Sequence, residues 1–234
     1  MFEELDYRPT PIGALSLRKR RDMISKEDIY EIILGDAYLM SSRFTVAEEA
    51  LARLGLAAVS GNNLHVAVGG LGLGYTARAA LEDERVASLL VVDALEPVID
   101  WHQEGLLPVG RELSADDRCS FQLGDFFDLA AAPEGLDQNE PSRKFDAILV
   151  DIDHSPTNVL DPKNAAFYEI DGLTQLSRHL TSNGVFALWS NDAPDPTFET
   201  ALSNVFSFTE SHVVPFTSPL NDVEETNTVY VGRL

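Results

Sequence analysis

Cysteine and basic residues are both scarce in this sequence. One cysteine, Cys119, stands among 234 residues, so no internal disulfide can form, and a reducing, cytoplasmic setting is expected. It falls in a predicted strand, where we interpret it as a small buried residue rather than a catalytic thiol. Lysine and arginine total 17 against 38 aspartates and glutamates, which gives a formal net charge of -21 at pH 7.

This shortage of positive charge argues against nucleic acid as a partner, because binding to phosphate backbones requires clustered Lys and Arg. The one locally basic segment, Arg18-Lys19-Arg20-Arg21, is interpreted as a strand or loop, either solvated or at a subunit interface. A negative field concentrates cations such as polyamines around a protein. The alternative is that the negative charge only keeps the protein soluble.

Long apolar runs and histidine clusters are missing as well. No uncharged apolar segment is long enough to span a bilayer, and the acidic start, Met1-Phe2-Glu3-Glu4, does not resemble a signal peptide, so we expect a soluble protein. The five histidines are scattered without paired spacing, so no metal is expected. Neither a Gly-x-Ser-x-Gly elbow nor a P-loop occurs, which weighs against those two kinds of catalytic site.

What the sequence does contain, from residue 64 onward, is an alternation of apolar strands and helices. The predicted strands are 64–68, 88–92, 118–123, 145–150 and 185–190, and the predicted helices begin at residues 75, 97, 172 and 196. This alternation predicts a mainly parallel sheet covered by helices on both faces. Strands at 211–216 and 228–232, joined by a Pro/Asn/Asp turn, are expected to add an antiparallel edge and to bring the sheet to seven strands.

The first 60 residues are expected to form an extension of a catalytic domain that spans 61–234. Prolines and a glycine near residue 10, followed by Leu15 and Leu17, indicate a short strand or hairpin. Two helices are predicted next, one over 27–34 and one that starts at Thr45 and ends near Gly55. In the second helix the Thr45 hydroxyl would cap the helix while Glu48 reaches back. The segment 130–143 is expected to be a polar surface loop.

The most informative segment is LHVAVGGLGLG, residues 64–74, in which an apolar run breaks into Gly69, Gly70, Gly72 and Gly74. A second apolar run then ends at Asp93. Glycines between a strand and a helix let the backbone turn sharply and approach a ligand, and an acid about 20 residues on can accept hydrogen bonds from a ribose. The segment predicts binding of an adenosine-containing cofactor, with a plain tight turn as the alternative.

Carboxylates follow each of the later strands. Ligands of an open parallel sheet bind beyond the carboxyl ends of its strands, so these acids are candidates for one shared site. Asp125 is placed to accept from an adenine amino group, and Asp151 is placed to face a substrate. Asp153 and His154 come directly after Asp151. His154 either faces the substrate or is a loop residue bonded to the backbone. An NAD-dependent dehydrogenase is a further alternative that Asp93 permits.

Residues 64–184 resemble the spermidine synthase family, the polyamine aminopropyltransferases, which share the core of class I S-adenosylmethionine-dependent methyltransferases. The glycine turn stands where that family has GGGDGG, and FDAILVD, residues 145–151, is similar to the strand that ends in its catalytic aspartate. Phe167-Tyr168 match an aromatic pair of the family. The resemblance implies a Rossmann-like α/β fold and a homodimer.

The resemblance also implies a reaction. An aminopropyl group would move from decarboxylated S-adenosylmethionine to a diamine such as putrescine, with Asp151 as the general base. The four glycines, Asp93 and Asp125 would bind the nucleoside, and Asp153 and His154 would bind the amine, with no metal.

Two positions depart from the family. Gly72 replaces an aspartate that helps hold the aminopropyl end, and His154 replaces a second aspartate that helps bind the amine. A methyltransferase that uses S-adenosylmethionine on a small molecule is therefore one alternative. A non-catalytic relative that binds a nucleoside or a polyamine is another.

Overall fold

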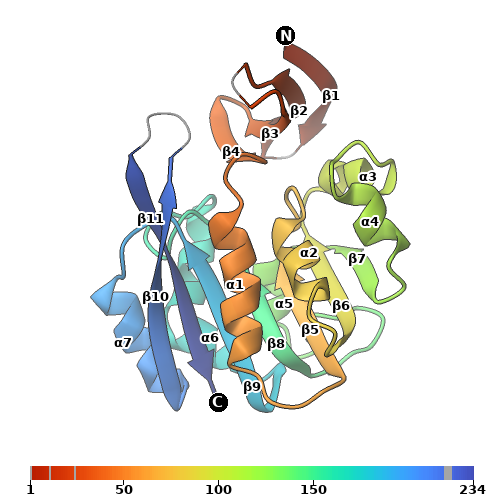
Figure 1. The fold of residues 1–234 in the computed structure, drawn as a ribbon. Coiled ribbons are helices and arrows are strands. Elements are labelled where there is room, and N and C mark those ends of the chain that lie inside the picture. The colour runs from red at the N-terminus through yellow and green to blue at the C-terminus, as the bar shows by residue number, and fades with distance from the viewer. Residues whose placement is uncertain (1, 11, 24, 219–222) are drawn as a thin grey trace.

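Two β-sheets organise the chain (Figure 1). The computed structural model describes residues 2–10, 12–23, 25–218 and 223–234. A four-stranded antiparallel sheet comes first and has the order β1-β2-β3-β4. Its strands are β1 (Phe2–Thr10), β2 (Gly13–Arg21), β3 (Asp28–Leu34) and β4 (Ala37–Ser41).

The second sheet has seven strands in the order β10-β11-β9-β8-β5-β6-β7. Its parallel strands are β5 (Leu64–Gly69), β6 (Val86–Asp93), β7 (Cys119–Leu123), β8 (Phe145–Val150) and β9 (Leu180–Ser190). The antiparallel edge consists of β10 (Phe208–Thr217) and β11 (Glu224–Arg233). This sheet confirms the predicted Rossmann-like α/β fold, while the predicted Pro/Asn/Asp turn at 219–222 lies outside the described residues.

Helices cover both faces of this sheet, because its parallel strands carry apolar side chains on both faces. One face carries α1 (Val46–Ala57), α2 (Tyr75–Leu81), α3 (Glu96–Gln103) and α4 (Gly110–Ala115). The other carries α5 (Phe126–Ala131), the 3-10 helix η1 (Pro162–Tyr168), α6 (Ile170–Ser177) and α7 (Pro196–Val205). In β5, for example, Val66 and Val68 join the first core while Ala67 joins the second.

Helix α1 packs closely on the middle of the sheet, as the front view in Figure 1 shows. A β-carbon on Gly55 would come within 2.6 Å of Leu149 on β8, so the glycine permits this close approach. Leu15, Leu17 and Ile32 of the four-stranded sheet belong to the same core as α1. Helix α1 thus lies inside the predicted 1–60 extension yet packs on the seven-stranded sheet, and the division at residue 60 stays a prediction.

Several local predictions were wrong. Residues 28–34 form β3 and not the predicted helix over 27–34, because their β-branched isoleucines favour an extended chain that pairs with β2. The Thr45 side chain makes no capping bond to α1, and its hydroxyl donates instead to Glu49 Oε1 at 3.3 Å. The helices α4, α5 and η1 were not predicted. The segment 130–143 is not wholly a surface loop, because Ala130 and Leu136 are buried.

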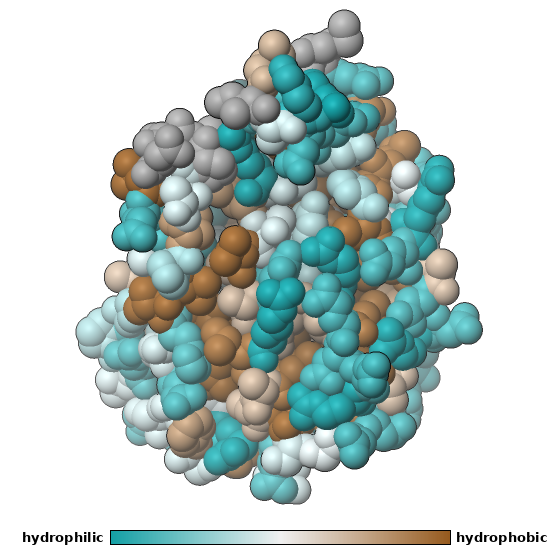
Figure 2. Space-filling view, viewed as in Figure 1, coloured by the Kyte–Doolittle hydropathy of each residue, from teal (hydrophilic) through white to brown (hydrophobic). Residues whose placement is uncertain are grey.

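The basic segment Arg18–Arg21 lies on β2, one of the two placements that the sequence allowed. Its charges pair with acids on the neighbouring strands: Arg18 with Glu4, Arg20 with Glu31, and both Lys19 and Arg21 with Asp28. The surface over this sheet is largely hydrophilic in Figure 2. In the described part of the chain, no helix is both long and apolar enough to cross a membrane.

The packing of α1 on the sheet yields a stability prediction. Leu51 is fully buried in that contact, so Leu51→Ala is expected to lower the free energy of unfolding by about 2–5 kcal/mol in urea denaturation. Val46, on the same helix, is 52% exposed, and Val46→Ala should change it by less than about 0.5 kcal/mol. Equal effects of the two substitutions would contradict the packing described.

Candidate functional site

The glycine turn and the end of β8 are in direct backbone contact. Gly70 has φ of +92°, and a β-carbon there would overlap the carbonyl oxygen of Asp151. The Asp151 N–H donates to the Gly69 carbonyl at 2.8 Å, and the Gly70 N–H donates to the Val92 carbonyl at 2.9 Å. Only glycine fits this position without displacing β8, so the turn and Asp151 are held side by side.

Met40, which lies on β4 in the four-stranded sheet, reaches over the same turn. The Leu73 N–H donates to Met40 Sδ at 3.0 Å, and a β-carbon on Gly72 would overlap the Met40 methyl group. The Gly72 carbonyl accepts from His102 Nε2 at 2.9 Å. Burial lowers the pKa of His102 to about 4, so His102 is a neutral donor at physiological pH. Gly74 completes the turn as the N-cap residue of α2.

The Asp93 side chain holds the glycine turn by hydrogen bonds to its backbone. Its Oδ2 accepts from the Leu71 N–H and its Oδ1 from the Leu95 N–H, both at 2.8 Å. Burial raises the pKa of Asp93, and these N–H groups, together with that of Gly72, oppose the rise. The carboxylate therefore orders the turn itself. Ribose binding by Asp93 stays a prediction.

Asp151 and Glu48 form a pair of carboxyl groups beside the turn. Both line one small cavity with Met40, Leu71 and Tyr75. Thr76 on α2 donates its hydroxyl proton to Asp151 Oδ2 at 2.7 Å. Glu48 comes from the first turn of α1, which brings it to the face of the sheet on which Asp151 projects.

The two carboxyls differ in acidity. Burial raises the pKa of Asp151 to about 6, against a smaller opposing effect of the Thr76 hydroxyl. Burial and the charge of Asp151 together raise the pKa of Glu48 to about 8. Near pH 7 the pair therefore holds about one proton between its two carboxyls. The pair can accept a proton at Asp151 and can take on a second negative charge when a cation approaches.

The strand next to β8 carries an indole, and a phenol lines the cavity. Trp189 follows Leu188, which pairs with Val150 on β8, so Trp189 lies on the strand next to Asp151. Its Nε1–H is buried and has no hydrogen-bond partner within the described chain. Tyr75 lines the cavity directly, and its ring lies 4.9 Å from the guanidinium of Arg78. A buried donor without a partner indicates where a ligand acceptor would gain a hydrogen bond.

Asp125 lies at the predicted strand end but is already engaged. It caps α5 by accepting from the Phe127 N–H at 2.9 Å, and it pairs with Lys163 Nζ at 2.6 Å. Burial alone would raise the pKa of Asp125, but Lys163 and the backbone N–H groups outweigh it and lower the pKa. Adenine binding by Asp125 stays a prediction.

Asp153 is a buried structural residue in this fold. It is 1% exposed, and its oxygens accept from the Leu160 N–H, the Asn164 amide and the Tyr168 hydroxyl at 2.6–3.1 Å. These bonds hold the segment that follows β8, and substrate binding by Asp153 stays a prediction. The backbone carbonyl of His154 accepts from the Asn191 N–H at 2.7 Å, and its side chain is half-buried.

The sequence reasoning missed three site residues, Glu48, Thr76 and Met40. For Glu48 a signal existed, because a charged residue between the buried Ala47 and Leu51 is unusual on the inner face of a helix. Met40 carried no signal, since a methionine in a strand normally indicates packing. Among the residues that the structure describes, no group of three His, Cys, Asp or Glu side chains is arranged to hold a metal ion.

No protein-family model matches this sequence. Two solved structures share its fold. One is a spermidine synthase in complex with the transition-state analogue AdoDATO, with a TM-score of 0.74 and 16% identity over 98% of this chain and 73% of that one. The other is the spermidine synthase from Thermotoga maritima, with a TM-score of 0.72 and 15% identity over 98% of this chain and 72% of that one. The chain therefore has a spermidine-synthase-like fold, its N-terminal sheet included.

The raised pKa of Glu48 predicts a pH-dependent stability difference. Below the ordinary pKa of 4.5, Glu48 is neutral in folded and unfolded chains alike, so Glu48→Gln should be nearly neutral there. As pH rises from 4.5 to about 8 the unfolded chain ionises first, so the wild type loses stability that the variant keeps. Urea denaturation above pH 8 should show the variant more stable by about 5 kcal/mol, because the pKa rises from 4.5 to about 8 and each unit corresponds to roughly 1.4 kcal/mol. A difference that does not change with pH would contradict this account.

Proposed function

We propose that this protein is an alkyl transferase that moves an aminopropyl group from decarboxylated S-adenosylmethionine to an aliphatic amine such as putrescine. The observation that carries the proposal is the pair formed by Asp151 and Glu48, held against a glycine turn by the contact at Gly70. The spermidine-synthase-like fold supports the same assignment, because a solved spermidine synthase with this fold holds the transition-state analogue AdoDATO.

The residues of the turn fit a methionine-derived ligand. The Leu73 N–H already donates to a thioether sulfur, that of Met40, so this donor points away from the turn at an acceptor outside it. Met40 is unbranched and flexible, and a change of its rotamer would open the space over Gly72 and Leu73. A sulfonium nucleoside supplies a carbon bonded to a good leaving group, a neutral thioether.

The amine must lose a proton before it can react. An alkylammonium of pKa about 10.4 is only about 0.1% neutral at pH 7.4. Deprotonation therefore adds roughly 4 kcal/mol to the free-energy barrier of an uncatalysed attack. Asp151, ionised at that pH, accepts this proton. The nitrogen lone pair then forms the new bond to carbon while the carbon–sulfur bond breaks and its electrons go to sulfur.

Glu48 makes the site responsive to a cation. It is largely neutral when the site is empty, and a nearby ammonium group favours its ionised form. Loss of its proton then places two carboxylates around the amine. We assign the positioning of the amine to Glu48 and Thr76, and proton acceptance to Asp151, while the predicted roles of Asp153 and His154 are not needed.

A methyltransferase that uses S-adenosylmethionine is the second candidate. The feature that favours it is Gly72, where a carboxylate that could hold an aminopropyl ammonium is missing and the apolar Met40 lies instead. The carboxylate of S-adenosylmethionine would be repelled less at Gly72 than at a position that carries an aspartate.

Calorimetry with the two sulfonium nucleosides separates these functions. The aminopropyltransferase should bind decarboxylated S-adenosylmethionine at least about tenfold more tightly, because the carboxylate of S-adenosylmethionine would lie near Asp151. Turnover of putrescine should fall about 100-fold or more in Asp151→Asn, with nucleoside affinity little changed. The matched control is Asp171→Asn, an exposed acid on α6.

Preference for S-adenosylmethionine would reject the aminopropyl assignment in favour of methyl transfer. Full turnover in Asp151→Asn would reject Asp151 as the base. Binding of a nucleoside without turnover of any amine would identify the protein as a non-catalytic relative.

A further inference from the structure

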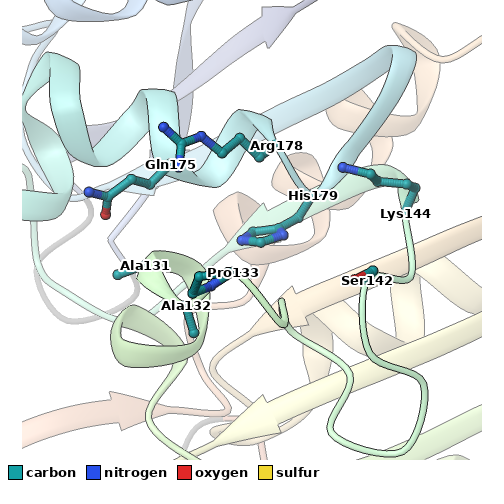
Figure 3. Close-up of a pocket in the computed structure, with 8 residues that line it drawn as sticks. All are labelled: Ala131, Ala132, Pro133, Ser142, Lys144, Gln175, Arg178 and His179. Atoms are coloured by element: carbon teal, nitrogen blue, oxygen red, sulfur yellow. The ribbon is translucent and has the colours of Figure 1, made fainter.

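A second cavity lies at the opposite end of the seven-stranded sheet from the glycine turn, where β8 and β9 begin. Its volume is about 170 Å³. Three segments wall it: the end of α5, the residues just before β8, and the end of α6. Figure 3 shows the eight lining residues, Ala131, Ala132, Pro133, Ser142, Lys144, Gln175, Arg178 and His179.

Positive charge without counter-ions distinguishes this cavity. In a protein of net charge -21, most basic side chains of the described residues form ion pairs, but Lys144 and Arg178 form none with a described carboxylate. Arg178 directly follows α6, where the helix dipole favours a cation. Lys144 belongs to no helix, so the dipole does not account for it.

His179 adds a third nitrogen group. Its Nε2 lies 3.0 Å from the Ala130 carbonyl, which can only accept, so Nε2 carries the proton in the neutral ring. Nδ1 has no hydrogen-bond partner in the described chain. Burial and the charges of Lys144 and Arg178 lower the pKa of His179, against the opposing effect of the Ala130 carbonyl. Lys144 and Arg178 are the two charged residues that line the cavity with the ring, because the α5 wall contributes only alanines and a proline.

We propose that this cavity binds a small tetrahedral oxyanion, either a free inorganic ion or the phosphate group of a small ester. Lys144 and Arg178 would supply charge, and the Ser142 hydroxyl and the Gln175 amide would supply further donors. The volume is below the roughly 300–1,000 Å³ typical of pockets for larger ligands, which disfavours a whole nucleotide. This site is separate from the transferase site, so it does not depend on the function proposed above.

Sulfate is the probe that tests the proposal, because it stays a dianion over the whole range from pH 5 to 8. Titration followed by NMR of the His179 ring should show a saturable shift, together with a rise in the pKa of His179. The double variant Lys144→Gln/Arg178→Gln should weaken sulfate binding at least about tenfold. Lys26→Gln serves as the matched control, since Lys26 is an exposed lysine elsewhere in the chain.

The result that would overturn the proposal is a His179 signal that does not saturate with sulfate, or a double variant that binds as well as the wild type. Equal weakening by Lys26→Gln would show general screening and would also overturn it. The wild-type titration stands even if the double variant fails to fold. A parallel comparison of inorganic phosphate with glycerol phosphate decides the source, since tighter binding of the ester would identify an esterified group.

Discussion

The site depends on one backbone contact, that between the glycine turn after β5 and the end of β8. Gly69 pairs with Val150 in the parallel register, the Asp151 N–H donates back to Gly69, and Gly70 leaves no β-carbon in the way of the Asp151 carbonyl. A side chain at Gly70 would push β8 away and take Asp151 with it. The conformation of the glycine turn therefore fixes the position of Asp151.

Helix α1 adds the second carboxyl to this arrangement. Its inner face packs Leu51 and Gly55 on the sheet, and the same face carries Glu48 toward Asp151. Burying two carboxyl groups together disfavours their ionised forms, and the raised pKa values of both acids are the consequence. A fold selected for stability alone would place apolar residues here, so the pair indicates a function that involves proton transfer or a cation.

The parts of the fold that follow from local pattern could be predicted from the sequence. The alternation of apolar strands and helices predicted the seven-stranded sheet. The run of glycines predicted the turn beside which Asp151 lies. The errors came from residues whose roles are set by distant partners. Residues 28–34 are extended because β2 pairs with them. Glu48 lines the cavity with Asp151, although its spacing from Thr45 is typical of a capping box. Met40 joins the site only because the four-stranded sheet packs beside the turn.

The same limit applies to Asp153 and to the oxyanion cavity. Substrate binding by Asp153 stays a prediction, and in the structure the Tyr168 hydroxyl and the Asn164 amide donate to its carboxylate inside the core. Lys144 and Arg178 are 34 positions apart and line the same cavity only because β8 and β9 begin side by side. Spacing along the chain does not predict which distant residues the fold brings together.

The central claim is that Asp151 and Glu48 share one proton near neutral pH. Carbon-13 NMR of the side-chain carboxyls, assigned with Asp151→Asn and Glu48→Gln, measures this directly. The account predicts one ionisation near pH 6 at Asp151 and a second near pH 8 at Glu48, with the second moving to lower pH when putrescine is added. Two carboxyls that both ionise below about pH 5, and that do not respond to the amine, would contradict it.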